Sequence, residues 1–343
     1  MARIALDAMG GDFAPDATIA GALHAILELG PEHSLQLVGP AALIRERVAA
    51  LSTGKLAPAS EHADRIEVID APDVIEMSDK PAAALRNKPN SSMVVGLKLQ
   101  ADGRSDAFVS AGNTGAQMAA STLLLKLHAG LTRPAIATLF PTAQKPIVVL
   151  DSGANVDCSA QELVQFARLG VVYAEDVLGR HNPIVGLLSI GEEPEKGNAV
   201  VKEANQLLRT AGVNFQGNIE GRDLPAGGSD RGPVDVVVCD GFVGNVVLKF
   251  YEAIAPMMIG MMQTHLGLDP ATLTTALKHL DYSEYGGAPL LGVRGVSVIS
   301  HGKSSPRAIK NAIKVGAKAA ESRMSDHIGR RLDGAAASTG ATA

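Results

Sequence analysis

Short apolar runs separated by longer amphipathic stretches recur along the whole chain. Runs of strand length lie at residues 4–6, 35–38, 66–69, 107–109, 135–140, 147–150, 184–188, 234–238 and 296–299. Stretches with helical periodicity lie between them, at residues 41–50, 93–99, 117–127 and 161–177. Strands that alternate with helices in this way predict an α/β fold with a mostly parallel sheet wrapped by helices.

Four polar segments rich in glycine follow apolar runs directly. They are DAMGGD at 7–12, SAGNTGA at 110–116, LDSGANVD at 150–157 and DGFVGN at 240–245. Ligands bind at the carboxyl ends of parallel strands, and glycine lets the backbone approach an anion closely. We therefore expect one composite site for a phosphate-like group. The glycine order does not match G-x-G-x-x-G, so a dinucleotide site is not predicted.

The residues expected to bind the anion come from these segments and from one histidine near the last strand. They are Asp7, Gly10, Gly11, Asp12, Ser110, Gly112, Asn113, Thr114, Asp151, Asn155 and His301. A helix predicted from Thr114 adds free N–H groups and a partial positive charge at its amino end. Structural roles stay open: a plain turn at 7–12, N-capping by Asn113 or Thr114, and a structural role for His301.

Lys196 stands in an acidic loop, SIGEEPEKGN at 189–198, ahead of a helix predicted over 199–208. A cation is disfavoured at the amino end of a helix, so a bound anion nearby would explain the lysine. The alternative is that Glu192, Glu193 or Glu195 forms an ion pair with it.

Two further segments suggest partners. Four methionines lie within six residues, in PMMIGMM at 256–262. They favour core or dimer packing, or else a helix that lies on a bilayer or against an acyl chain. Arg307, Lys310, Lys314 and Lys318 are spaced to share one face of a helix. That face is either solvated surface or a docking site for an acidic carrier protein.

Composition narrows the class of protein. A chain of 343 residues with 46% hydrophobic residues is long and apolar enough to fold around a core. A net charge of −5 and the absence of Trp disfavour nucleic-acid binding. Cys158 and Cys239 are too few for a disulfide framework or a zinc cage, and no metal or other cofactor is expected. The chain lacks a signal-peptide pattern and an unbroken run of about 18 apolar residues, so we expect a cytoplasmic protein.

Neither composition nor internal repeats mark a domain boundary. We expect a single α/β unit over residues 1–333, from which a Met-rich helical segment at about 246–282 protrudes. The small polar tail at 334–343 is expected to be disordered.

In their order along the chain, these segments resemble the bacterial phosphate acyltransferases of phospholipid synthesis. The likeness runs from about residue 3 to residue 324. Its anchors are DAMGGD, NSSM at 90–93, SAGNTGA, RPAIAT at 133–138, LDSGANVD, GEEPEKGN at 191–198, GFVGN at 241–245, YGGAPLLG at 285–292 and SHG at 300–302. One such string would be weak, whereas nine in sequence are specific.

The resemblance implies a fold of the isocitrate and isopropylmalate dehydrogenase type, in a homodimer bound loosely at the inner face of the cell membrane. It implies transfer of a fatty acyl group from acyl carrier protein to inorganic phosphate. The product, acyl phosphate, would enter phosphatidic acid synthesis through a downstream glycerol-3-phosphate acyltransferase. Lys196 and Asn245 would occupy catalytic positions, because they lie in GEEPEKGN and GFVGN.

Attack of phosphate on a thioester needs no enzyme nucleophile, so positioning and charge are the tasks left to the protein. Ser110, Asn113 and Thr114 would hold phosphate together with the glycine amides. Lys196 would offset charge repulsion, and Asn245 would donate to the developing oxyanion.

Three rival functions remain. They are a phosphate acetyltransferase that uses acyl-coenzyme A, a metal- and NAD-dependent decarboxylating dehydrogenase, and a non-catalytic membrane scaffold for lipid synthesis. The missing dinucleotide fingerprint and the lack of a clear acidic metal trio count against the dehydrogenase. The scaffold leaves the four anion-ready loops unexplained.

Overall fold

The computed structural model describes residues 1–267, 269, 272–273 and 284–340. The chain forms two compact units: unit 1 contains Met1–Pro134 and Tyr285–Ala343, and unit 2 contains Ala135–Glu284. This division differs from the single unit expected, because the chain leaves unit 1 and returns to it with no change of composition at either crossing. Residues 268, 270–271 and 274–282 of the expected Met-rich segment lie outside the described residues.

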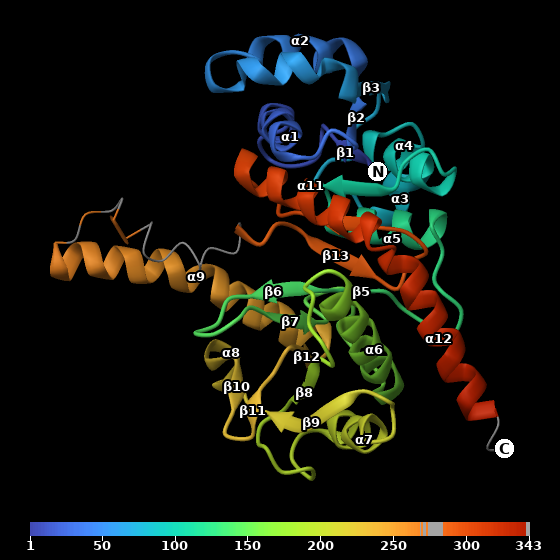
Figure 1. The fold of residues 1–343 in the computed structure, drawn as a ribbon, viewed down its shortest axis with the longest axis vertical. Coiled ribbons are helices and arrows are strands. Elements are labelled where there is room, and N and C mark those ends of the chain that lie inside the picture. Colours follow the sequence, from blue (N-terminus) through green and yellow to red (C-terminus); the bar gives the residue numbers. More distant parts are fainter. Residues whose placement is uncertain (268, 270–271, 274–283, 341–343) are drawn as a thin grey trace. The chain divides into compact units, whose positions relative to one another are not determined.

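Unit 1 contains a sheet in the order β3-β2-β1-β4-β14-β13 (Figure 1). The strands are β1 (Arg3–Asp7), β2 (Ser34–Gly39), β3 (Ile66–Asp70), β4 (Ala107–Ser110), β13 (Ala288–Leu291) and β14 (Ser297–Ile299). Neighbours from β3 to β14 are parallel, and β13 is antiparallel to β14. Parallel sheets are covered on both faces, and β1 and β4 are accordingly buried almost along their whole length.

Helices surround this sheet. They are α1 (Asp16–Glu28), α2 (Ala41–Leu51), the 3-10 segment η1 (Gly54–Arg65), α3 (Pro81–Asn87), α4 (Ser92–Ala101), α5 (Thr114–Leu124), α11 (Pro306–Glu321) and α12 (Met324–Gly340). A Cβ on Gly21 of α1 would lie 2.6 Å from Cβ of Ile309, so glycine allows α1 and α11 to pack closely. Residues 334–340 of the tail expected to be disordered continue α12, as their alanine content favours; residues 341–343 lie outside the described residues.

Unit 2 contains a second sheet in the order β6-β7-β12-β8-β9 (Figure 1). Its strands are β6 (Thr138–Phe140), β7 (Ile147–Leu150), β8 (Ile184–Leu188), β9 (Asn214–Ile219) and β12 (Val236–Val238), preceded by β5 (Ala135–Ile136) and accompanied by the hairpin of β10 (Gly228–Ser229) and β11 (Gly232–Pro233). Strands β7, β12, β8 and β9 are parallel in turn, and β6 is antiparallel to β7. The helices are α6 (Ala160–Asp176), α7 (Ala199–Leu208), α8 (Asp223–Ala226) and α9 (Gly241–Leu266).

The predicted α/β class is confirmed in both units. The helices predicted at 41–50, 93–99 and 161–177 match α2, α4 and α6 to within two residues at each end. A capping box of Ser159 and Glu162 defines the start of α6. Helix α5 begins at Thr114, as predicted from SAGNTGA, because Asn113 caps it; it begins and ends three residues before the periodic stretch 117–127.

Candidate active site

The candidate residues divide between the two units, and each unit is described by itself. In unit 1, Asp7 ends β1, Ser110 ends β4, and His301 follows β14 by two residues. These three strands are neighbours and run parallel, so their carboxyl ends share one edge of the sheet. The sequence prediction that these segments meet is therefore confirmed for the segments of unit 1.

Asp7 and Ser110 satisfy each other's hydrogen bonds. The Ser110 hydroxyl donates to Oδ2 of Asp7 at 2.7 Å, and Oδ1 of Asp7 accepts from the Met9 N–H at 3.1 Å. The Gly112 N–H donates to Oγ of Ser110 at 3.0 Å. Asp7 and Ser110 are both buried. The pair thus joins the loops after β1 and β4, and it stabilises the edge of the sheet from a buried position.

Two positions in DAMGGD require glycine because of this close packing and the backbone conformation of the turn. A Cβ on Gly10 would lie 2.7 Å from Oδ2 of Asp7 and 2.8 Å from the Gly112 nitrogen, closer than side chains pack. Gly11 has φ of 111°, a backbone conformation that favours glycine. The segment is therefore a tightly packed turn whose glycines are needed for the turn itself.

Burial raises the pKa of Asp7, although hydrogen bonds from Ser92 and Ser110 oppose the shift. The folded protein therefore binds this proton more tightly than the unfolded chain, and the cost of ionised Asp7 appears as pH rises from the unfolded to the folded pKa. We expect Asp7→Asn to gain stability relative to the wild type as pH rises through that window. Urea unfolding in steps from about pH 4 to pH 8 measures this difference.

The matched control for this prediction is Asp12→Asn, at an exposed carboxylate in the same segment. A difference in free energy of unfolding between Asp7→Asn and the wild type that stays constant with pH would contradict the burial argument.

Asn113 is the N-cap of α5. Its Oδ1 accepts from the Ala116 N–H at 3.0 Å, and its Nδ2 donates to the carbonyl oxygens of Met77 and Asp79 at 3.1 and 2.9 Å. The capping role left open from the sequence is therefore confirmed. Thr114 is exposed at the first position of the helix, where N–H groups lack intrahelical acceptors. Thr114 and these N–H groups are the part of the segment that can meet an anion.

His301 has an assigned tautomer. Its Nδ1 accepts from the Lys303 N–H at 3.1 Å, which places the proton of the neutral ring on Nε2. The Asp12 N–H donates to the Gly302 carbonyl at 2.7 Å and joins this loop to DAMGGD. His301 is therefore held at the carboxyl edge of β14, next to the loop that contacts DAMGGD.

In unit 2, Asp151 organises the loop that follows β7. Its Oδ1 accepts from the N–H groups of Ile136 and Ala154, both at 3.0 Å. Its Oδ2 accepts from the backbone N–H and the side-chain amide of Asn155, at 2.6 and 2.8 Å. Asp151 is fully buried, and burial raises its pKa against these hydrogen bonds. Asp151 and Asn155 therefore build the loop from within.

The start of α9 lies against this loop. The Gly241 N–H donates to the Asn155 carbonyl at 2.7 Å, and a Cβ on Gly244 would lie 1.9 Å from the Asp151 carbonyl oxygen. A Cβ on Gly153 would lie 3.4 Å from Oδ1 of Asn245. Asn245 is exposed as the fifth residue of α9, beside the LDSGANVD loop. Its amide is thus available to a ligand at this edge.

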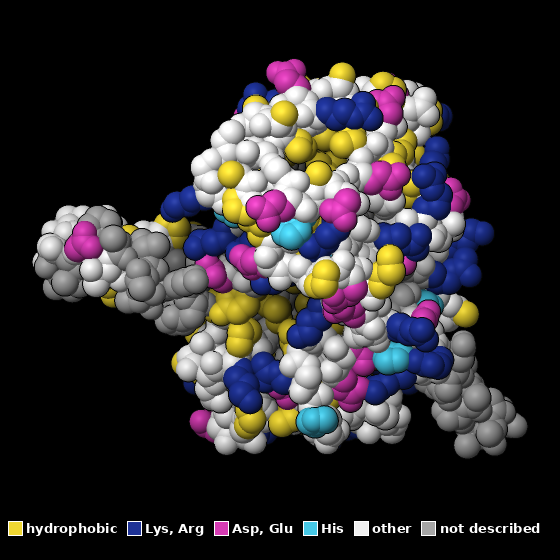
Figure 2. All heavy atoms as spheres, turned by 45° about the horizontal axis from the view of Figure 1, so that its top comes forward, with side chains coloured by type: hydrophobic (Ala, Val, Ile, Leu, Met, Phe, Trp, Pro, Cys, Tyr) yellow, Lys and Arg dark blue, Asp and Glu magenta, His cyan; other side chains and the backbone are white. Residues whose placement is uncertain are grey.

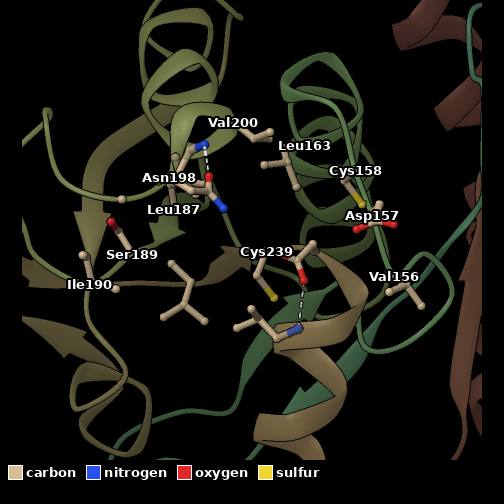
Figure 3. A pocket seen from close by; sticks show the side chains of 15 residues that line it. Val156, Asp157, Cys158, Leu163, Leu187, Ser189, Ile190, Asn198, Val200 and Cys239 are labelled. Carbon is tan, nitrogen blue, oxygen red and sulfur yellow. Dashed lines mark hydrogen bonds between the residues drawn. The ribbon is translucent and has the colours of Figure 1, made fainter.

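Lys196 follows β8, which is a direct neighbour of β12. Its side chain is exposed, and within the described part of the chain it forms no ion pair. Glu192 instead faces two arginines, Arg231 at 3.3 Å and Arg222 at 4.0 Å. The ion pair proposed as the alternative for Lys196 is therefore not formed. The loop that holds Lys196 and the start of α9 also border a cavity of about 640 Å³ in unit 2 (Figure 3).

The two cysteines are unsuited to nucleophilic chemistry. Burial raises the pKa of Cys158 to about 12 and raises that of Cys239 well above its usual value. A thiolate is the reactive form of cysteine, so neither side chain offers an acyl-enzyme nucleophile near neutral pH.

Comparison with known proteins identifies the family. A family model described as "Fatty acid synthesis protein" matches residues 2–327. The chain is 47% identical over 342 residues to a phosphate acyltransferase of Desulforamulus reducens, covering 97% of this chain and 98% of that protein. It is 45% identical over 339 residues to a phosphate acyltransferase of Endomicrobium trichonymphae, covering 95% and 96%. The chain belongs to the phosphate acyltransferase family.

Membership of this family makes the chain an acyltransferase that acts with phosphate, as the sequence resemblance predicted. Among solved structures, it is similar in fold to a EutD phosphotransacetylase from Staphylococcus aureus, with a TM-score of 0.59 at 15% identity over 93% of this chain and 94% of that chain. A phosphotransacetylase from Streptococcus pyogenes gives the same values. At this identity the likeness supports the fold class alone.

Some contacts of the candidate residues could not be predicted from the sequence. Ser92 hydrogen-bonds to Asp7 and belongs to the NSSM string, but a serine next to a helix N-cap carries no signal of a distant partner. In α11, Lys310 and Lys314 both bond to Glu28 of α1, at 2.7 and 2.8 Å. The basic stripe expected there is thus partly neutralised within unit 1.

Proposed function

We propose that this phosphate acyltransferase moves a fatty acyl group from acyl carrier protein to inorganic phosphate. The acyl phosphate formed would enter phosphatidic acid synthesis through a downstream glycerol-3-phosphate acyltransferase. The observation that carries the proposal is Lys196, an exposed cation without an ion pair among the described residues, on a loop whose next residues, Gly197 and Asn198, line an apolar cavity. The start of α9, the helix that carries Asn245, lines the same cavity. A cation, an oxyanion donor and an apolar recess are what a phosphate and an acyl thioester require.

In the proposed reaction, a phosphate oxygen attacks the thioester carbonyl carbon and forms a C–O bond. The C–S bond then breaks, and the carrier thiol leaves as a thiolate that takes up a proton from solvent. Lys196 reduces the repulsion between the phosphate dianion and the developing negative charge, and Asn245 donates a hydrogen bond to the carbonyl oxygen. No enzyme nucleophile takes part, which agrees with the raised pKa values of Cys158 and Cys239.

A second anion-binding element is proposed in unit 1. Thr114 and the N–H groups at the start of α5 are its donors, and His301 belongs to the same edge of the sheet. Asp7, Ser110 and Asn113 keep these donors in place through their own hydrogen bonds. Gly10, Gly11 and Gly112 keep the turn compact, and Asp12 ties it to the loop of His301.

Release of free thiol from a long-chain acyl carrier thioester, with and without phosphate, tests the function. We expect thiol release to require phosphate and to yield one acyl phosphate per thiol. A coenzyme A thioester of the same fatty acid tests the rival acyl donor. A higher kcat/KM with this thioester than with the carrier thioester would show that coenzyme A, and not acyl carrier protein, is the preferred donor. Thiol release that does not depend on phosphate would overturn it.

Helix α9 carries the surface for the proposed membrane attachment. The segment Gly241–His265 is long and apolar enough to span a bilayer. Only 6% of its most apolar 18-residue window is buried within the protein. Its exposed side chains Phe242, Val246, Phe250, Met257 and Met261 are spaced along one side of the helix. Lys249 and Glu252 form an ion pair at 2.8 Å, so we propose that α9 lies on the membrane rather than across it. The proposed assembly is a homodimer.

We expect Met261→Glu to weaken liposome binding by about tenfold or more, because it removes an exposed apolar side chain that would enter the membrane and adds a charge. Flotation with vesicles that contain anionic lipid measures the bound fraction. The control is Gln263→Glu, which adds the same charge on another side of α9. Equal binding by both variants would mean that the stripe does not contact the membrane.

The proposed docking of acyl carrier protein falls on what remains of the basic face of α11. Lys310 and Lys314 form ion pairs with Glu28, and Arg307, Lys314 and Lys318 are exposed. On the face shown in Figure 2, Lys and Arg side chains lie among Asp and Glu side chains. Steering of an acidic carrier would therefore depend on a few exposed cations rather than on a broad basic patch.

A further inference from the structure

A cavity in unit 2 has apolar walls and a polar rim. Its volume is about 640 Å³. Apolar side chains reach it from α6, β8 and α7, among them Leu163, Leu187 and Val200 (Figure 3). The polar rim consists of Asp157, Asn198 and Asp240, and the last two are occupied as the N-caps of α7 and α9.

Exposure falls from one end of the cavity to the other. Val156 and Ile190 are 63% and 82% exposed, which marks the mouth. Leu163 and Leu187 are 2% and 0% exposed, which marks the floor. A ligand that enters at the mouth therefore meets hydrocarbon at increasing depth. This gradient suits a chain with one polar end.

Chain neighbours of the two proposed catalytic residues line the cavity. Gly197 and Asn198 line the cavity and follow Lys196 directly. Asp240 and Val243 line it from the start of α9, whose next residues are Gly244 and Asn245. The hydroxyl oxygen of Ser189 is buried at the cavity wall and has no hydrogen-bond partner among the described residues.

The volume matches a long acyl chain. A methylene group takes up about as much room as a water molecule, about 30 Å³ in the liquid, so a chain of 16 carbons needs about 480 Å³. The cavity therefore holds such a chain with some room left for the thioester at the mouth. Cavities of this size and lining are usual for small apolar ligands.

We infer that this cavity binds the acyl chain of the thioester, with the methyl end at Leu163 and Leu187 and the carbonyl at the mouth near Ser189. The inference rests on the proposed function and adds to it the residues that select chain length. The cavity floor limits the chain, and Val200 on α7 narrows its path.

The first test is a chain-length profile of phosphate-dependent thiol release. Val200→Phe fills part of the cavity, and each methylene that loses its buried position costs about fourfold in binding. We expect the ratio of kcat/KM for 16-carbon over 8-carbon thioesters to fall about tenfold or more. Leu207→Phe is the matched control, since Leu207 lies on the same helix outside the cavity lining. An unchanged ratio in folded Val200→Phe would overturn the inference.

The second test does not depend on catalysis. The chain contains no Trp, so Val200→Trp introduces a single fluorescent reporter into the cavity. A 16-carbon fatty acid brominated near its methyl end should quench this Trp and leave Gln206→Trp, exposed on the same helix, unquenched. Equal quenching of both variants, or of neither, would overturn the inference.

These tests separate the cavity from the function. Quenching without phosphate-dependent thiol release would support the cavity and overturn the proposed reaction. Thiol release with no quenching and no change in chain-length profile would support the reaction and overturn the cavity. Displacement of the brominated acid by pantetheine that carries no acyl chain would assign the cavity to the carrier's arm instead, and would also overturn the inference.

Discussion

Lys196→Ala is expected to lower kcat for acyl phosphate formation by about 100- to 1,000-fold and to leave the free energy of unfolding nearly unchanged. The ammonium group is exposed and has no ion pair in the described structure, so its removal exposes no buried charge. A loss of this size is typical when one group that stabilises transition-state charge is removed. The effect should appear in kcat because the repulsion between phosphate and the developing oxyanion is greatest in the transition state.

Lys202→Ala is the matched control for this prediction. Lys202 is exposed on α7, six residues from Lys196, and does not line the cavity. Single-turnover release of thiol at saturating phosphate, measured on folded protein, separates kcat from binding. Near wild-type turnover in Lys196→Ala would remove the lysine from the chemistry, and a similar loss in Lys202→Ala would point to a general effect on the α7 region.

Gly244→Ala is expected to destabilise the protein by about 3 kcal/mol or more and to abolish activity. The new Cβ would lie 1.9 Å from the Asp151 carbonyl oxygen, and this contact is with backbone, which cannot turn aside. Relief of the clash requires the start of α9 to move away from the LDSGANVD loop. Asn245 would move with it, so the oxyanion donor is displaced even where the protein still folds.

Gly260→Ala provides an internal control with the opposite sign. Gly260 lies in the same helix, and a Cβ there meets no atom within 4 Å. Alanine in an exposed helical position is about 0.5–1 kcal/mol more favourable than glycine, so this variant should be slightly more stable than the wild type. Urea unfolding of both variants gives the comparison. Equal stability of Gly244→Ala and the wild type would mean that α9 does not pack against the Asp151 loop as described.

Much of the fold followed from local pattern. The continuous apolar runs of β7 and β12 predict strands buried on both faces, and the helices between the strands carry their own caps, such as Ser159 for α6. The candidate loops were found for the same reason. Where a buried strand ends in glycine and short polar residues, the chain must turn at the carboxyl edge of a sheet.

Local pattern could not assign partners across the sheet. Asp7 and Ser110 are 103 residues apart, and no feature of either segment shows that the serine donates to the aspartate. The acidic loop around Lys196 likewise allows an ion pair with Glu192 on sequence grounds. In the structure, Glu192 instead forms an ion pair with Arg231, which comes from another loop. Choices of this kind depend on which elements pack together.

The sequence by itself determined the α/β class and the loops at strand ends that can bind an anion, whereas the catalytic roles proposed for Lys196 and Asn245 rest on the resemblance to a family. These features are encoded within short segments, because strand burial, helix capping and glycine turns are local properties of the chain. Only the tertiary structure decided that Asp7, Ser110 and Asn113 are engaged within the protein, that Lys196 is left without an ion pair in the described structure, and that α6, β8 and α7 enclose an apolar cavity. Each of those outcomes depends on contacts between segments far apart in sequence, where burial and competition among partners decide which polar groups are satisfied and which remain for a ligand.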